Sequence, residues 1–256
     1  MPKELSFFVV GTQKGGTTAL HRMLSQHPEL RLSPRKELHF FDDEKRNWAE
    51  ADYKDLAAQS STRFKCGDFT PIYMYWPNSI ARIHSYNKDA KIIVLLRNPM
   101  YRAFSHWRME RIRGLDNLSF ADAISPIGRS RVETSLDSVH RVYSYVERGL
   151  YSKQLKNIYR YFPRSAVLVA RTDSLYRDPN SRLSTICRHI EIEELHLPHV
   201  GHVSPVEIPA DYEWQNGFEQ SRQKLFDLFI DDLFELTNLV DVDITDWLEP
   251  WYEESF

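Results

Sequence analysis

Residues 5–18 constrain the fold of this chain more than any other stretch. Residues 5–10 form a short run that is apolar apart from Ser6, the pattern of a strand that is buried on both faces of a sheet. The run leads directly into the loop GTQKGGTT (11–18), and a helical pattern extends from Thr17 to about Gln26 and stops before Pro28. A buried strand, a glycine loop and a helix in this order predict an α/β fold with a parallel sheet.

The alternation of strand and helix continues along the chain. Residues 91–96 are the clearest further strand, and shorter candidates lie near Leu30, at 65–70 and at 166–170. Helices are predicted between and after these strands, from apolar residues at helical spacing or from polar runs that favour a helix. The predicted helices are 47–59, 77–86, 99–113, 138–148, 152–161 and 179–190.

Two stretches depart from this alternation. Residues 114–137 are polar and contain Pro126, so we expect an irregular surface segment there. Residues 218–240 predict a long amphipathic helix packed on the sheet. The whole pattern predicts a P-loop-like, three-layer α/β fold, with a mostly parallel central sheet, helices on both faces and a helical, acidic C-terminal part. At 256 residues and without a convincing linker, we expect a single domain, residues 1–256.

Composition excludes several classes of protein. Hydrophobic residues make up 42% and charged residues 27% of the chain, as in an ordinary globular protein. The apolar runs are far shorter than the roughly 18 residues of a membrane-spanning helix. The N-terminus leaves no room for a signal sequence before the glycine loop, so we expect a cytoplasmic protein. Cys66 and Cys187 fit neither a disulfide framework nor a metal spacing and predict buried thiols.

The charge is distributed unevenly. Of a net charge of −3, residues 205–256 carry −12 and the first 204 residues carry +9. An anionic ligand is therefore expected on the first part of the chain. Lys and Arg are too sparse there to predict nucleic-acid binding.

The glycine loop resembles a phosphate-binding loop with one residue displaced. Gly11 and Gly16 have the spacing of loops that surround nucleoside triphosphates with backbone N–H groups. Two threonines follow Gly16 where such loops carry lysine, and Lys14 lies inside the loop. The strand at 91–96 ends in Arg97, not in an aspartate that would hold magnesium. This pattern predicts an anion site without a metal ion; a purely structural glycine turn is the alternative.

Three segments together resemble one family. GTQKGGTTAL (11–20), KELHFF (36–41) and RNPMYRAFSHW (97–107) are similar to motifs of the sulfotransferases that use 3′-phosphoadenosine 5′-phosphosulfate (PAPS). The likeness is greatest to the heparan sulfate type and its soluble bacterial relatives. RGLYSKQL (148–155) extends it through about residue 190.

The resemblance implies how PAPS is bound. It assigns the 5′-phosphosulfate to a run of loop and helix residues: Lys14, Gly15, Gly16, Thr17 and Thr18. Lys14 would also stabilise charge on the leaving phosphate. Arg97 and Ser105 match the pair that holds the 3′-phosphate, and both donate to phosphate oxygens without a metal ion.

The resemblance also implies the chemistry. Glu37 matches the catalytic base, which takes the proton of an acceptor hydroxyl as it attacks sulfur in an in-line displacement that releases 3′-phosphoadenosine 5′-phosphate (PAP). His39 would position the hydroxyl or tune Glu37; packing beside Phe40 and Phe41 is the alternative. The acceptor is a carbohydrate, a phenol or a hydroxyacyl chain.

The match fails in the last quarter of the chain. Heparan-type enzymes close a basic loop over the 3′-phosphate, but residues 199–215 contain neither Lys nor Arg. The candidates to replace it are Arg188, Arg222 and Lys224. A P-loop nucleotide-binding module or a kinase-like enzyme without sulfuryl transfer is therefore the alternative function.

Two further patterns have structural alternatives. His196, His199 and His202 recur every three residues, but Pro198 breaks the helix that such a metal site requires. The aromatic residues of YMYW (73–76), with Trp48 and Trp107, would either line an acceptor pocket or pack in the core. Tyr151 would either contribute to the cofactor or acceptor site or pack in the core.

Overall fold

The structure of the chain, a computed structural model, describes residues 4–33, 35–57, 63–194 and 212–254. The chain divides into two compact units. Unit 1 consists of Met1–Leu96, Asn157–Pro205 and Phe256, and unit 2 of Arg97–Lys156 and Val206–Ser255. That the whole chain acts as one domain stays a prediction.

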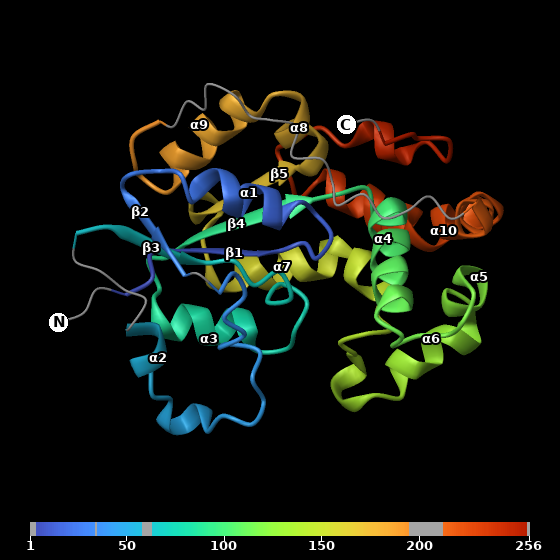
Figure 1. Ribbon diagram of the computed structural model, residues 1–256, viewed down its shortest axis with the longest axis horizontal. Helices are drawn as coiled ribbons and strands as arrows, with labels where there is room; N and C mark the ends of the chain where they lie inside the picture. The colour runs from blue at the N-terminus through green and yellow to red at the C-terminus, as the bar shows by residue number, and fades with distance from the viewer. Residues whose placement is uncertain (1–3, 34, 58–62, 195–211, 255–256) are drawn as a thin grey trace. The chain divides into compact units, whose positions relative to one another are not determined.

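In the described part of unit 1, five strands form one parallel sheet in the order β2-β3-β1-β4-β5 (Figure 1). The strands are β1 Phe7–Gly11, β2 Leu30–Leu32, β3 Lys65–Asp68, β4 Lys91–Leu96 and β5 Val167–Arg171. β4 is paired with β5 from Ile92, opposite Val167, to Leu96, opposite Arg171. Because every pair is parallel, the carboxyl ends of the strands meet at one edge, where ligands of such folds bind.

The helices of unit 1 connect these strands or follow the last strand, β5. They are α1 Thr17–Leu24, α2 Lys54–Ala57, α3 Ser79–Tyr86, α8 Thr172–Arg177 and α9 Pro179–His189, with the 3-10 turns η1 Trp48–Glu50 and η4 Arg164–Ala166. α7, Tyr151–Tyr161, begins in unit 2 and ends in unit 1.

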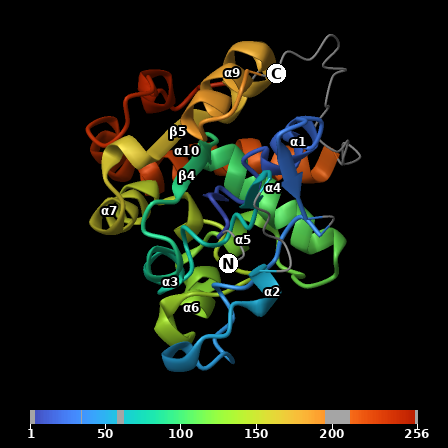
Figure 2. The same ribbon diagram turned by 90° about the vertical axis from the view of Figure 1, so that its left-hand side faces the viewer.

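Helices cover both faces of the sheet (Figures 1 and 2). On one face, Phe7 of β1 belongs to a buried cluster with residues of α1, α8 and α9. On the other face, Phe8 packs edge-on against Phe41 and against Tyr86 of α3, with ring centroids 5.7 and 6.3 Å apart. Consecutive strand residues point to opposite faces, so a strand covered on both sides must be apolar throughout. The predicted three-layer α/β fold is confirmed.

Unit 2 is helical in its described part. Its elements are α4 Pro99–Ile112, α5 Phe120–Ala123, α6 Pro126–Glu133 and α10 Tyr212–Thr237, with the 3-10 turns η2 Leu136–Ser138, η3 Glu147–Gly149 and η5 Thr245–Leu248. Phe218 of α10 packs against Phe104 of α4 and Phe120 of α5. We expected α10 to pack on the sheet, but its principal partners are α4, α5 and η5. Its aromatic residues Trp214 and Phe218 pack against aromatic residues of α4 and α5.

Two predictions of local structure were wrong. Residues 114–137 were expected to be irregular, yet they hold α5 and α6, whose first turns are capped by the side chains of Ser119 and Ser125. Residues 138–148 were expected to be helical but form turns. There the His140 ring accepts the N–H of Val142, and such local bonds compete with a helix.

Two smaller expectations concern single features. Every helix in the described ranges is too short or too polar to cross a membrane. Cys66 and Cys187 are both buried, as the sequence predicted.

Candidate active site

The glycine loop joins β1 to α1 at the carboxyl edge of the sheet. Two of its residues have left-handed backbone conformations, Lys14 at φ 69° and Gly16 at φ 83°. Gly15 has no room for a side chain, because a Cβ atom there would lie 2.7 Å from the carbonyl oxygen of Leu95 on β4. The loop therefore lies directly against the end of β4.

The N-terminus of α1 completes this loop. Gly16 is its N-cap residue and offers no side chain to bond the first N–H groups of the helix. Such N–H groups, together with the helix dipole, attract anions. Thr17 is buried and Thr18 exposed, and Lys14 is partly exposed. The five residues predicted to bind the 5′-phosphosulfate thus lie together at one junction of loop and helix.

Thr172 ties the loop to the sheet. It is the first residue of α8, directly after β5, and its hydroxyl lies 2.8 Å from the carbonyl oxygen of Gly15 and 3.0 Å from that of Leu96. The backbone of the loop is thereby attached to the ends of β4 and β5. Sequence reasoning missed Thr172; its signal is a threonine directly after a predicted buried strand.

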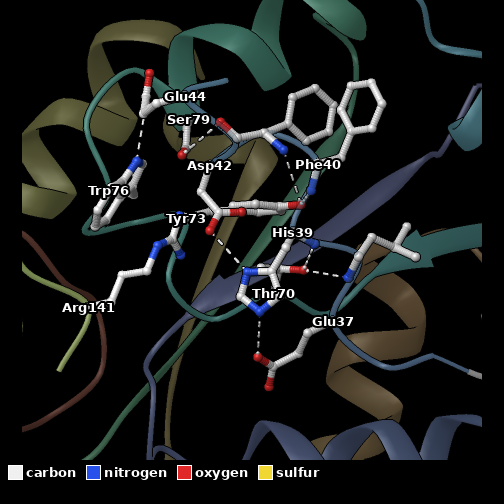
Figure 3. Close-up of polar contacts among 12 residues, drawn as sticks. Glu37, His39, Phe40, Asp42, Glu44, Thr70, Tyr73, Trp76, Ser79 and Arg141 are labelled. Atoms are coloured by element: carbon white, nitrogen blue, oxygen red, sulfur yellow. Dashed lines mark hydrogen bonds and ion pairs between the residues drawn. The ribbon is translucent and has the colours of Figure 1, made fainter. Parts of the chain in front are cut away.

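Residues 36–42, which we call the base segment, bring four charged side chains into contact with one another, and Figure 3 shows three of them, Glu37, His39 and Asp42. Lys36 Nζ lies 2.7 Å from Glu37 Oε1, and His39 Nε2 lies 3.3 Å from Glu37 Oε2. The other ring nitrogen of His39, Nδ1, lies 2.9 Å from Oδ2 of the buried Asp42. The imidazole thus lies between two carboxylates. Sequence reasoning found Glu37 and His39 but missed Asp42.

These contacts set the charges of the base segment. Burial raises the pKa of Glu37, but the hydrogen bond from His39 and the charge of Lys36 outweigh burial and lower this pKa to about 2. Hydrogen bonds to Asp42 and Glu37 raise the pKa of His39 to about 9. At neutral pH an ionised Glu37 therefore faces a protonated His39. Such a carboxylate accepts hydrogen bonds readily but is a weaker base than an ordinary glutamate.

Three buried residues at the end of β3 and in the turn after it hold the base segment. Thr70 Oγ1 donates to Asp68 Oδ1, and the Tyr73 hydroxyl donates to Asp68 Oδ2, both at 2.7 Å. The same two hydroxyl oxygens accept the backbone N–H groups of Leu38 and Phe40, both at 3.0 Å. Of the two sequence interpretations of Tyr73, the core one is confirmed, because its ring is fully buried.

The turn after β3 links the base segment to the glycine loop within unit 1. His21 of α1 packs edge-on against Phe69 at the start of this turn, with ring centroids 4.9 Å apart. The N–H of Met74 donates to the carbonyl oxygen of Val10 at 3.0 Å, and a Cβ atom on Gly11 would lie 1.9 Å from Met74 Sδ.

The two residues predicted for the 3′-phosphate belong to unit 2. Arg97 directly follows β4, and its Nε lies 2.9 and 3.0 Å from the two carboxylate oxygens of Glu254. Ser105 lies on α4 and is partly buried. Tyr151 donates to the carbonyl oxygen of Arg97 at 2.8 Å and is fully buried, so it is a core residue.

The other candidates are less informative. Arg222 is buried and forms an ion pair with Glu219, whereas Arg188 and Lys224 are exposed. Trp107 is buried in the core of unit 2. The three histidines at 196, 199 and 202 and most of residues 199–215 lie outside the described residues. Within the described ranges, no group of three or more His, Cys, Asp or Glu side chains is arranged to hold a metal ion.

Comparison with known proteins identifies relatives over most of the chain. A family model described as a sulfotransferase domain matches residues 5–204. Mouse heparan sulfate glucosamine 3-O-sulfotransferase 6 is 31% identical over 186 residues, which are 70% of this chain and 49% of that protein. Mouse heparan sulfate glucosamine 3-O-sulfotransferase 3B1 is 32% identical over 180 residues, or 70% and 44%. The chain spans about half the length of the curated relatives it matches.

A solved structure agrees with these matches. A sulfotransferase from Alicyclobacillus acidocaldarius superposes with a TM-score of 0.76 at 26% identity, over 96% of this chain and 100% of that one. The matched residues 5–204 include the glycine loop, the base segment and Arg97. By its fold and by this match, the chain belongs to the sulfotransferase domain family.

Proposed function

We propose that this chain transfers a sulfuryl group from PAPS to an acceptor hydroxyl. The observation that carries the proposal is that the turn after β3 bonds the backbone next to Glu37 through Thr70 and contacts the start of the glycine loop through Met74. Membership of the sulfotransferase domain family supports PAPS as the donor. Glu37, the predicted base, and the predicted donor loop thus belong to the same edge of one sheet.

The residues present fit a donor with two anionic groups. Gly16, the N-cap of α1, has no side chain to bond the first N–H groups of this helix, and Lys14 adds a positive charge to the loop. We assign the 5′-phosphosulfate to Lys14 and to the residues 15–18, and the 3′-phosphate to Arg97 and Ser105. The carboxylate of Glu254 on Arg97 stands in for two phosphate oxygens, since a guanidinium fork binds either group in the same way. The proposal includes no metal ion.

The reaction is an in-line displacement in which PAPS supplies the activated sulfuryl group and PAP is the product. A bond forms between the acceptor oxygen and sulfur, the bond from sulfur to the 5′-phosphate oxygen breaks, and the hydroxyl proton moves to the Glu37 carboxylate. Lys14 stabilises the charge that develops on the phosphate. His39 positions Glu37 through the contact between its Nε2 and Glu37 Oε2. Positioning and electrostatic stabilisation supply most of the acceleration in this proposal.

We propose a carbohydrate hydroxyl as the acceptor. The relatives that support this choice are named as heparan sulfate glucosamine 3-O-sulfotransferases. Phenols and hydroxyacyl chains are the other acceptor classes to test. A cytoplasmic location stays a prediction from the sequence.

The test is transfer of labelled sulfate from PAPS to a panel of acceptors. The panel contains an N-sulfated glucosamine oligosaccharide, 4-nitrophenol and a 3-hydroxyacyl pantetheine. We expect the saccharide to be labelled fastest. Labelling of another acceptor alone would correct the acceptor class. No labelling at all, with Mg-ATP bound more tightly than PAP in calorimetry, would instead support the nucleotide-binding or kinase-like alternative.

A further inference from the structure

The turn between β3 and α3 contacts both halves of the proposed site. It begins after Asp68, the last residue of β3, and passes through Thr70, Tyr73 and Met74. The proposed reaction requires none of these residues to touch the donor or the acceptor. Their burial and their contacts nevertheless give them a role in the geometry of the site.

The hydrogen bonds of the turn have a fixed direction. A hydroxyl has one proton to donate and two lone pairs that accept. Thr70 and Tyr73 both donate their protons to Asp68, one to each carboxylate oxygen. Their oxygens are therefore oriented to accept the N–H groups of Leu38 and Phe40. One buried carboxylate thus orients two hydroxyls, which in turn hold two amides of the base segment.

The two amides lie where the base segment bends. Leu38 directly follows Glu37, and Leu38 and Phe40 flank His39, whose φ of 53° is left-handed and uncommon for a residue other than glycine. A chain without fixed acceptors rarely adopts this conformation. Figure 3 shows Tyr73 and Thr70 bonded to the backbone on either side of this bend, with the Glu37 side chain beyond His39.

The same turn also contacts the glycine loop. Met74, the residue after Tyr73, donates its N–H to Val10 on β1 and packs so closely on Gly11 that no side chain fits there. The hydroxyl oxygen of Thr12, in the glycine loop, lies 3.8 Å from Met74 Sδ. Neighbouring residues of one turn therefore hold the base segment and the start of the glycine loop.

We propose that Tyr73 is a positioning residue for Glu37: its hydroxyl, oriented by Asp68, fixes the base segment at a set distance from the glycine loop. This inference rests on the proposed function. In-line transfer requires reacting atoms about 3–3.5 Å apart, and a displacement of about 1 Å costs on the order of 100-fold in rate. We expect the loss of the Tyr73 hydroxyl to loosen the base segment at Phe40, whose N–H it accepts.

The first test measures how firmly the Tyr73 hydroxyl holds the backbone of the base segment. Tyr73→Phe keeps the buried ring and removes only the hydroxyl. Amide hydrogen exchange followed by NMR should become about tenfold or more faster at Phe40, the residue whose N–H loses its acceptor. Tyr145→Phe is the matched control, because Tyr145 is also fully buried and donates to a buried carboxylate, Asp116, at 2.8 Å, but in unit 2. It should leave exchange at Phe40 unchanged.

The second test measures turnover with the acceptor that the panel labels fastest. Tyr73→Phe should lower kcat about 10- to 100-fold. The Kd for PAP should stay within about twofold of the wild-type value, because the glycine loop keeps its own contacts. In a Glu37→Gln background the same change should lower kcat less than about threefold, since no base is left to position. A merely structural role predicts equal effects in both backgrounds.

A second pair of variants covers the case in which Tyr73→Phe does not fold. Thr70→Val removes the other hydroxyl with little change in shape, and Thr70→Ser keeps a hydroxyl. We expect Thr70→Val to be slow and Thr70→Ser to be close to wild type.

The outcomes separate this inference from the proposed function. Unchanged kcat in Tyr73→Phe, or full additivity with Glu37→Gln, overturns the positioning role alone. A wild-type chain that transfers no sulfate overturns the proposed function, and the positioning role with it.

Discussion

The carboxylate of Glu254 clamps the guanidinium of Arg97. The contacts between them are 2.5–3.0 Å long, and the two side chains are only 15% and 5% exposed for Arg97 and Glu254. A nearly buried ion pair of this geometry is a strong, directional contact. If Arg97 binds the 3′-phosphate, as we propose, the phosphate must replace a carboxylate that already occupies its place.

Glu254→Gln should therefore tighten the binding of PAP. We expect a gain of about fivefold or more, roughly 1 kcal/mol, because the neutral amide competes less well for the guanidinium. Calorimetry with PAP and with AMP, which lacks the 3′-phosphate, separates the causes: AMP affinity should not change. Glu253→Gln, at the exposed neighbouring position, controls for net charge. A gain for both nucleotides, or a loss for PAP, would contradict the assignment of Arg97.

Glu37→Gln should abolish most of the turnover and spare the binding of PAP. Loss of a general base typically lowers the rate about 10²- to 10⁴-fold. The fold should persist, because the glutamine amide still reaches His39. Sulfate transfer and PAP calorimetry on the same preparation measure both effects, and Glu50→Gln on the exposed η1 turn is the surface control. Wild-type turnover in Glu37→Gln would remove this residue as the base.

Lys14→Ala should weaken PAP binding and lower kcat together, since Lys14 is assigned to both the bound donor and the leaving phosphate. The φ of 69° at this position strains any residue other than glycine. Lys14→Gly removes the charge and relieves that strain, so the pair separates charge from backbone. We expect both variants to lose at least about tenfold in PAP affinity at low salt. Retained affinity in Lys14→Gly would contradict the loop assignment.

The parts of the site that sequence reasoning predicted are local. The β1 strand, the glycine loop and the start of α1 follow from consecutive residues, because burial, the glycines and helix spacing each act within a few positions. Glu37 and His39 were found through a short motif. Their contact also depends on neighbours in sequence, because the chain bends at His39.

The parts that were missed depend on contacts between distant residues. Asp68, Thr70 and Tyr73 act on a segment about 30 residues earlier in the chain, and no local pattern shows that their hydroxyls meet its amides. Glu254 is 157 residues from Arg97. The capped helices α5 and α6 were missed for another reason, since their serine caps were present but the polar composition was taken as irregular structure.

The last prediction concerns the pH at which the His39 ring loses its proton. Its pKa is raised to about 9 in the folded chain, chiefly by Asp42 and then by Glu37, so NMR should show the ring protonated at neutral pH with a midpoint near 9. Folding favours the protonated form. The resulting stabilisation is fully present below pH 6.5 and is lost as the pH rises through 9, and urea unfolding should follow this decline. Asp42→Asn should lower the midpoint and flatten the decline, whereas Asp43→Asn, at the next position, should do neither. A native midpoint below pH 7 would show that the ring is not held between two carboxylates in solution.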